Sequence, residues 1–436
     1  MCRRPRHKPD TQRKGTLTVR TVLLAIFFTL ACLPAKAEQL NVSLIGGGYG
    51  RSVFFEYGQR FKAETGIDIK WTVKHDADYK QSLNGWFEGA ETPDVIQWQG
   101  GERLFQYVRK NWVEPITDFW IDNSLGSSFT PAIQGTVTYG QEIYGVPYSF
   151  YHWGFYYKHS VFQSLGIQPP QTWDDLLAMC TTMRAAGLEP IVIGTRYHWP
   201  AAAWFDYLNL RLNGSDFHLA LTRGEINYTD DKVRDVFDHW KELLDADCFI
   251  AAATHRKMNW RDPLPYLYRD MAGTGLFGNF VTGEFAPRYE ADFRFFPFPK
   301  INDVPRAEEA PTDIFLIPAR SKHKENASKF LAFMARADIQ EEMSRRLKTI
   351  PTNKYAAISN DRFIAQGSDL LQTADGVAQF FDRDTPKPMA DTATVLFTDF
   401  METGDVDTTL VALEAARRKF YRKSATAALS DLTLID

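Results

Sequence analysis

Cysteine is scarce in this chain, and the sequence has no pattern of residues that usually holds zinc. Only four of the 436 residues are cysteine, and no C-x-x-C, H-E-x-x-H or paired Cys/His cluster occurs. A phosphate-binding motif is also missing, because the glycine-rich run at 46–50 completes neither G-x-x-x-x-G-K-S/T nor G-x-G-x-x-G. We therefore expect no metal centre and no cofactor.

The N-terminal apolar run is too short to span a membrane and has the features of a secretion signal. Residues 21–33 form a mostly apolar run of 13 residues, whereas a spanning helix needs about 20. The run follows a basic segment and precedes an A-x-A cleavage pattern at 35–37. We predict that residues 1–37 are a signal peptide and that the mature protein is periplasmic. Thr29 stands where lipoprotein signals usually carry leucine, which argues against lipidation of Cys32.

The predicted mature chain has no excess of positive charge. Residues 1–37 hold eight of the 50 Lys and Arg residues and one of the 54 Asp and Glu residues. The remainder therefore carries 42 basic and 53 acidic residues, a net charge of −11. Nucleic acids and anionic membranes select positive surfaces, so this balance argues against both as partners.

Two cysteines, Cys180 and Cys248, remain after position 37. The compartment of an exported protein would permit a disulfide between them. Cys180 also lies on the apolar face of a predicted helix, so two small buried hydrophobic residues would explain the pair equally well. The sequence leaves both alternatives open.

The pattern of apolar residues predicts an α/β protein. Strands are expected at 40–45, 67–73 and 93–98, and helices at 53–64 and 102–110. Strand, glycine turn and helix in this order are typical of a mostly parallel sheet. Further strands are expected near 270–280 and 311–318, with helices at 173–186, 232–245, 321–335 and from 338, and helical structure continues to about 421 except in a loop at 382–388.

The helix expected from Trp173 has the clearest signals. Thr172 is a good N-cap, and Asp175 stands at the N3 position of a capping box. The apolar residues Trp173, Leu176, Leu177, Cys180 and Met183 follow one another on a single helical face, and Gly187 supplies the left-handed stop.

Motifs between residues 144 and 353 occur in an order that resembles one protein family. An aromatic-rich run passes from Gly-Val-Pro at 145–147 to Tyr-Tyr-Lys at 156–158, and Pro-Pro-Gln-Thr-Trp follows at 169–173. Family motifs continue at 271–277, 296–299, 317–334 and 350–353. The chain resembles the maltose-binding-protein-like members of extracellular solute-binding protein family 1, which serve carbohydrate ABC importers. One departure is the missing Asn between Tyr157 and Lys158.

The resemblance implies a two-lobed α/β fold of the class II periplasmic binding protein type. Each lobe would be a mostly parallel sheet flanked by helices, with the ligand cleft between the lobes. Carried onto this chain, the first lobe would be 38–147 plus 310–352, and the second 148–309 plus 353–436. Closure of the lobes would trap a sugar or oligosaccharide. A monomer would then deliver this solute to the membrane permease subunits of an ABC importer.

Aromatic and polar residues that follow the expected strands are the candidates for sugar contact. Aromatic rings cover the C–H faces of sugars, and planar polar groups pair with their hydroxyls. In α/β proteins these groups lie in loops at the carboxyl ends of strands. The candidates are Tyr49, Trp98, Gln99, Glu102, Arg103, Tyr151, His152, Trp153, His198, Trp199, Trp204, Asn279, Phe280 and Asp313, with the loop at 384–391 as a weaker one.

Each candidate has a structural alternative. Large aromatic residues mostly fill protein cores, Glu102 and Arg103 fit the charged first turn of a helix, and His152 and His198 fit packed, hydrogen-bonded histidines.

Two other functions are alternatives to sugar binding. A secreted glycoside-active enzyme would need two carboxylates that face one bond, and no pair stands in a distinctive motif. A ferric-ion binder is suggested by the adjacent Tyr156 and Tyr157. In iron-transport proteins, however, such tyrosines lie late in the chain.

Overall fold

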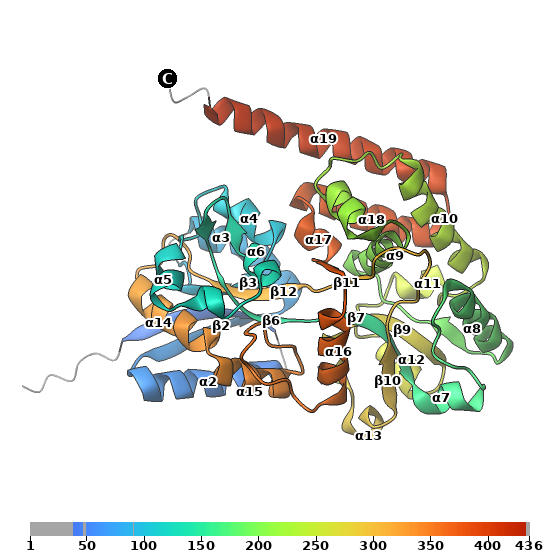
Figure 1. The fold of residues 1–436 in the computed structure, drawn as a ribbon, viewed down its shortest axis with the longest axis horizontal. Helices are drawn as coiled ribbons and strands as arrows, with labels where there is room; N and C mark the ends of the chain where they lie inside the picture. Colours follow the sequence, from blue (N-terminus) through green and yellow to red (C-terminus); the bar gives the residue numbers. More distant parts are fainter. Residues whose placement is uncertain (1–37, 47–48, 90, 433–436) are drawn as a thin grey trace, which may run out of the picture.

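A computed structural model describes residues 38–46, 49–89 and 91–432, with side chains up to residue 421 except at 49 and 77. The predicted signal peptide and Cys32 lie outside these residues. The described chain forms two α/β halves side by side, each built on its own sheet (Figure 1). Each half has its own hydrophobic core. The two-domain α/β prediction is therefore confirmed.

The first half contains a sheet with the strand order β2-β1-β3-β12-β6. β1 is parallel to β2 and β3, whereas β12 is antiparallel to β3 and β6. Its strands are β1 (Gln39–Ile45), β2 (Asp68–Lys74), β3 (Val95–Gln99), β6 (Val146–Phe150) and β12 (Thr312–Leu316). The helices of this half include α2 (Tyr49–Thr65), α3 (Asp76–Glu88), α4 (Glu102–Val108), α5 (Thr117–Asp122), α6 (Pro131–Gly135), α14 (Lys324–Ala335) and α15 (Ala337–Leu347). Helix α3 is absent from the sequence-based expectation.

The second half contains a sheet with the strand order β10-β7-β9-β8. β7 is antiparallel to β9 and β10, and β8 is parallel to β9. The strands are β7 (Trp153–Lys158), β8 (Glu189–Ile191), β9 (Ala272–Gly278) and β10 (Phe293–Phe296). Its helices include α7 (His159–Ser164), α8 (Trp173–Ala185), α9 (Ala202–Thr222), α10 (Asp231–Asp245), α11 (Ala252–His255), α12 (Leu264–Tyr268) and α13 (Pro287–Glu290). Both sheets are mixed rather than mostly parallel, because strands that arrive from the other half, such as β7 and β12, run against their neighbours.

Helix α8 has the predicted caps and carries one cysteine of a disulfide. The Thr172 hydroxyl accepts from the Asp175 N–H at 3.3 Å, and the Asp175 carboxylate accepts from the Thr172 N–H at 3.0 Å. Gly187 has the left-handed φ of +78°. Cys180 on this helix forms a disulfide with Cys248, with the two Cα atoms 5.1 Å apart. The bond ties α8 to the segment after α10.

Within the described residues, the chain passes between the halves at three places. The first lies between β6 and β7, the second between β10 and β12, and the third between α15 and α16 (Arg362–Gln372). At the second passage, β11 (Ala307–Glu309) pairs in parallel with β13 (Gly376–Ala378). This small sheet joins the second passage to the C-terminal helices.

The prediction of a loop at 382–388 is wrong, because most of this segment is helical. Helix α17 covers Phe381–Asp384, and α18 (Lys387–Thr403) begins three residues later. Pro388 falls in the first turn of α18, a position where the missing proline N–H costs nothing. Pro386 and Pro388 therefore lie at the start of a helix rather than in a loop. Helix α19 (Val406–Leu432) follows along the top of the molecule (Figure 1).

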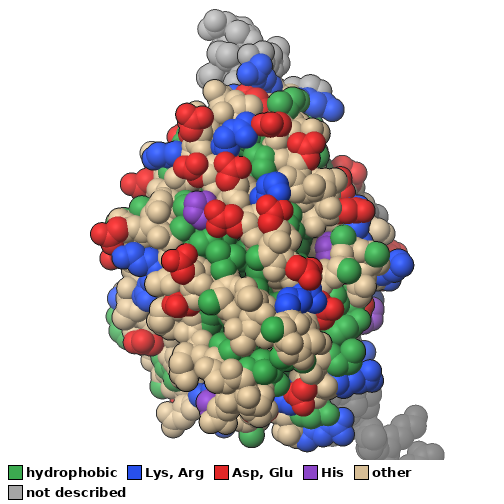
Figure 2. Space-filling model, turned by 90° about the vertical axis from the view of Figure 1, so that its right-hand side faces the viewer, with side chains coloured by type: hydrophobic (Ala, Val, Ile, Leu, Met, Phe, Trp, Pro, Cys, Tyr) green, Lys and Arg blue, Asp and Glu red, His purple; other side chains and the backbone are tan. Residues whose placement is uncertain are grey.

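The outer face of the second half, shown in Figure 2, carries acidic and basic side chains intermixed. No helix in the described residues combines the length and the apolar character that crossing a bilayer requires.

Candidate ligand-binding site

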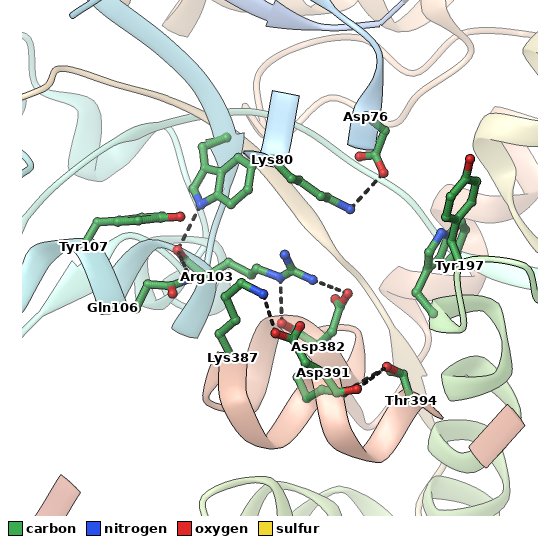
Figure 3. Close-up of a pocket in the computed structure, with 13 residues that line it drawn as sticks. Asp76, Lys80, Arg103, Gln106, Tyr107, Tyr197, Asp382, Lys387, Asp391 and Thr394 are labelled. Atoms are coloured by element: carbon green, nitrogen blue, oxygen red, sulfur yellow. Dashed lines mark hydrogen bonds and ion pairs between the residues drawn. The ribbon is translucent and has the colours of Figure 1, made fainter. Parts of the chain in front are cut away.

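A cavity of about 190 Å³ lies between the two halves (Figure 3). Helix α3, the end of β3 and helix α4 line it from the first half. The segment after β8, helix α17 and helix α18 line it from the second. The lining residues are Asp76, Lys80, Trp98, Arg103, Gln106, Tyr107, Tyr197, Trp199, Asp382, Lys387, Ala390, Asp391 and Thr394. Among the predicted site residues, Trp98, Arg103 and Trp199 meet here.

A close backbone approach brings α4 against α17 at this cavity. Gly101 precedes α4 with a φ of +74°, a conformation that glycine adopts without strain. A Cβ atom at this position would lie 2.7 Å from the carbonyl oxygen of Arg383. Any other residue would therefore push the halves apart at the edge of the cavity.

Arg103 and Asp382 form an ion pair across the two halves. The Arg103 Nε donates to the Asp382 carbonyl at 2.8 Å, and its terminal nitrogen pairs with the Asp382 carboxylate. The two side chains are only 10% and 13% exposed. Burial alone would raise the pKa of Asp382, but the charges of Arg103, Lys80 and Arg383 hold that pKa below its ordinary value. Asp382 is therefore ionised at neutral pH and fixes Arg103 at the cavity wall.

The charges around the cavity are paired with one another. Asp76 pairs with Lys80, Arg103 with Asp382, and Lys387 with Asp391. The described lining residues thus include three acids and three bases, and their formal charges cancel. A charged solute would have to break one of these pairs or leave its own charge without a partner, which is unfavourable in a partly desolvated site. The lining favours a neutral, polar solute.

Aromatic rings form a wall behind Trp199. The half-buried Trp199 meets the Trp153 ring edge to face at 6.1 Å and the Phe380 ring at 5.9 Å. Trp153 in turn meets Phe280, which contacts the rings of Tyr151 and Trp260. Trp153 is buried and is not one of the lining residues, so it supports Trp199 rather than facing the cavity itself.

A polar network lies behind the Arg103–Asp382 pair. Arg383 donates to the Tyr151 hydroxyl at 2.6 Å and to the Thr312 carbonyl at 2.9 Å, and it pairs with Asp313 at 3.2 Å. Asp313 stands opposite Gln99 in the β3–β12 register. Three predicted residues, Tyr151, Asp313 and Gln99, are therefore gathered next to the cavity without lining it. Burial raises the pKa of Asp313 against the opposing effect of Arg383.

Several predicted site residues occupy structural positions. Trp204 is fully buried against Phe155, Phe249 and Phe298, so no part of its ring is left for a solute. His152 is also fully buried. Its Nε2 lies 3.1 Å from the Tyr156 hydroxyl, and burial lowers the pKa of His152 to about 3. For both residues the structural alternative holds.

Three other predicted residues, Asn279, Glu102 and His198, are not among those that line the cavity. Asn279 is buried and donates to the Lys348 carbonyl at 3.2 Å, which links the two halves. Glu102 pairs with Arg109 at the C-terminal cap of its helix, and the half-buried His198 has a φ of +63°. Tyr49 begins α2, and its side chain lies outside the described ones.

Sequence reasoning missed much of the lining. Asp76 and Lys80 lie on α3, which was not predicted, although their i, i+4 spacing is a helical signal. Asp382 lies on α17, where a loop was expected. Lys387 and Asp391, by contrast, fall inside the weaker candidate loop at 384–391 and do line the cavity.

The geometry also bears on the ferric-ion alternative. Tyr156 and Tyr157 are consecutive in β7, so their side chains point to opposite faces of the sheet. Both are buried, at 0% and 5% exposure. They cannot bind one ion together in this arrangement. In the part of the chain that the structure describes, no group of three or more His, Cys, Asp or Glu side chains is placed to hold a metal ion.

Two α/β halves, joined by several chain passages and enclosing a solute-sized cavity, define a two-domain binding protein. Residues 49–341 match the family model of the bacterial extracellular solute-binding proteins. The chain belongs to this family.

Relatives and solved structures agree with the family assignment. An uncharacterised ABC transporter extracellular-binding protein of Pyrococcus horikoshii is 24% identical over 283 residues, which are 64% of this chain and 62% of the relative. The match thus spans less than two thirds of that relative. The diacetylchitobiose binding protein NgcE of Streptomyces coelicolor is 20% identical over 352 residues, or 76% of this chain and 72% of NgcE.

One solved structure has a fold similar to that of this chain and a named solute. The bacterial solute receptor AcbH, described as having an exclusive preference for β-D-galactopyranose, superimposes with a TM-score of 0.82 at 25% identity. The superposition covers 88% of this chain and 98% of AcbH.

Proposed function

We propose that this protein captures a neutral sugar in the cavity between its halves and presents it to the permease subunits of an ABC importer. The observation that carries the proposal is the lining itself. The exposed Tyr197 and the half-buried Trp199 stand beside three ion pairs whose charges cancel. Such a lining offers ring faces and hydrogen-bonding groups without a net charge. The sugars named for AcbH and NgcE belong to the same class of solute.

We further propose the bounds of the two lobes, the oligomeric state of the protein and its location. The lobes are 38–147 plus 310–352 and 148–309 plus 353–436, and they close on the solute. The mature protein is a periplasmic monomer after removal of residues 1–37, and it binds without catalysis. Family membership supports an extracytoplasmic location.

A panel of matched neutral and charged sugars tests the preference for a neutral solute. We expect D-galactose, maltose or diacetylchitobiose to raise the melting temperature, because a ligand at about 100 times its Kd stabilises the folded state by about 2.7 kcal/mol. D-galacturonate and galactose 6-phosphate should give no shift at the same concentration. A shift with the charged sugars alone would contradict the charge balance that we infer from the cavity.

The absence of catalysis is tested on the sugar that binds. Incubation of the protein with an oligosaccharide that binds should release no new reducing ends over many hours. Release that is proportional to protein concentration would instead favour the glycoside-active enzyme.

A further inference from the structure

Two buried carboxyl groups face each other beside the second passage between the halves. Asp206 lies on α9 and Glu309 ends β11, and both side chains are fully buried. Glu309 pairs with Ala378 in the β11–β13 register. The Asp206 Oδ2 accepts the Phe381 N–H at 2.7 Å, at the first residue of α17. The pair therefore touches the chain segments that lead into the cavity.

If both groups were ionised, three of their four carboxylate oxygens would be buried without a hydrogen-bond donor in the described part of the chain. Among the described residues, no donor reaches Asp206 Oδ1 or either carboxylate oxygen of Glu309. Two carboxylates are both acceptors and cannot bond each other, whereas one proton between them makes a hydrogen bond. Burial raises the pKa of both groups well above the ordinary value, and the charge of Asp206 raises that of Glu309 further.

The basic groups near the pair do not supply the missing positive charge. Arg211 is committed to Glu308 at 2.7 Å and to the carbonyls of Phe298 and Ala307. The His218 Nε2 is 3.8 Å from Asp206 Oδ1, and burial lowers the pKa of His218 to about 4, so it is neutral at pH 7.

Other neighbours make a second negative charge still less favourable. Asp382 and Asp384 on α17 both act on the pair electrostatically. Burial raises the pKa of Asp384 to about 6, so Asp384 is ionised in alkaline solution. Burial also raises the pKa of Tyr151, Tyr207 and Tyr228, which face the pair and stay neutral.

We propose that Asp206 and Glu309 share one proton at neutral pH and act as a positioning pair for α17, so that alkaline solution, by removing this proton, weakens solute binding. Helix α17 carries Asp382 into the cavity and Arg383 into the network behind it. Repulsion between two carboxylates next to the Phe381 N–H would displace these side chains. The statement about solute binding rests on the proposed function, whereas the shared proton does not.

The sign of the pH effect follows from proton counting. The folded state holds a proton that the unfolded chain releases above about pH 4, the usual carboxyl range. Stability due to this pair therefore falls as the pH rises toward the folded-state pKa. Glu309→Gln keeps a hydrogen-bond donor at this place but cannot lose a proton to solvent. We expect the melting temperature of the wild type, measured without ligand, to fall below that of Glu309→Gln progressively between pH 7 and pH 10.

Matched variants and a direct observation sharpen the test. Asp206→Asn should flatten the profile in the same way, while Glu325→Gln, at a carboxylate that is 85% exposed, should follow the wild type. Infrared spectra of the wild type at pH 7.5 should show a protonated carboxyl band that Glu309→Gln lacks, and this readout needs no ligand. Superimposable melting profiles of the wild type and Glu309→Gln would overturn the shared proton. If a variant failed to fold, absence of the band from the wild-type spectrum at pH 7.5 would overturn it as well.

The pH dependence of solute binding tests the positioning role of the pair separately from the shared proton. With the neutral sugar that gives the largest shift in the panel, affinity of the wild type should fall by up to about tenfold per pH unit once the pair ionises, and Glu309→Gln should lose this dependence. Equal pH profiles of affinity would overturn the positioning role. If no sugar in the panel binds, the proposed function fails, while flattened melting profiles would still support the shared proton.

Discussion

Replacement of Arg103 by glutamine is expected to weaken sugar binding by about 100-fold and to lower the melting temperature as well. The substitution leaves the Asp382 carboxylate, which is 13% exposed, without its counter-charge. Breaking a buried ion pair from one side costs about 3–5 kcal/mol, and about 2.7 kcal/mol corresponds to a 100-fold change in affinity. Because the pair joins the two halves, we expect most of this cost to fall on the proposed closed form that holds the solute.

Arg109, the residue that follows the same helix, provides a matched control. It pairs with Glu102 but is 41% exposed, and such surface pairs contribute only about 0–1 kcal/mol. We expect Arg109→Gln to bind sugar nearly as the wild type does in calorimetric titration. If Arg103→Gln and Arg109→Gln bind equally well, the ion pair between the halves has no part in holding the solute.

Replacement of Trp199 by alanine should weaken sugar binding by about 1–3 kcal/mol, or roughly 5- to 150-fold, through loss of ring contact. Trp199 is half-buried and lines the cavity, so part of its ring is free for a solute. Trp199→Phe should keep most of the affinity, because it keeps an apolar ring against Trp153. Calorimetric affinities of the three proteins for one sugar measure the effect. Equal affinity of Trp199→Ala and the wild type would remove Trp199 from the site.

Trp98 and Trp153 are less suitable for this test. Each is only 2% exposed, and the Trp98 Nε1 donates to the Arg103 carbonyl at 2.9 Å. Truncation of such a residue leaves a cavity in the core and costs several kcal/mol of stability. Loss of binding in these variants would therefore mix a contact effect with partial unfolding.

The local elements that the sequence predicted best are those whose signals lie close together in the chain. Thr172, Asp175 and Gly187 define α8 within a few residues, and the structure confirms all three roles. Helix α3 was missed because its buried stripe, Tyr79, Leu83 and Phe87, is short and interrupted by polar residues. The local pattern of α3 is weak, and burial of these three side chains in the core of the first half stabilises the helix.

The site was harder to predict because its parts are distant in sequence. Arg103 and Asp382 are 279 residues apart, and no periodicity or motif links them. Trp199 and Trp204 follow the same strand and are chemically alike. Only the packing of α9 on Phe155 and Phe298 decides that one lines the cavity and the other fills the core. Local patterns thus identified the type of residue, and the long-range packing selected which ones meet.

A crystal structure with the best-binding neutral sugar tests the central claim most directly. We expect the sugar ring to lie in the cavity between the halves, within contact distance of Trp98 or Arg103 on one side and of Trp199 on the other. A sugar bound outside this cavity, or held by one half alone, would contradict the account of the site.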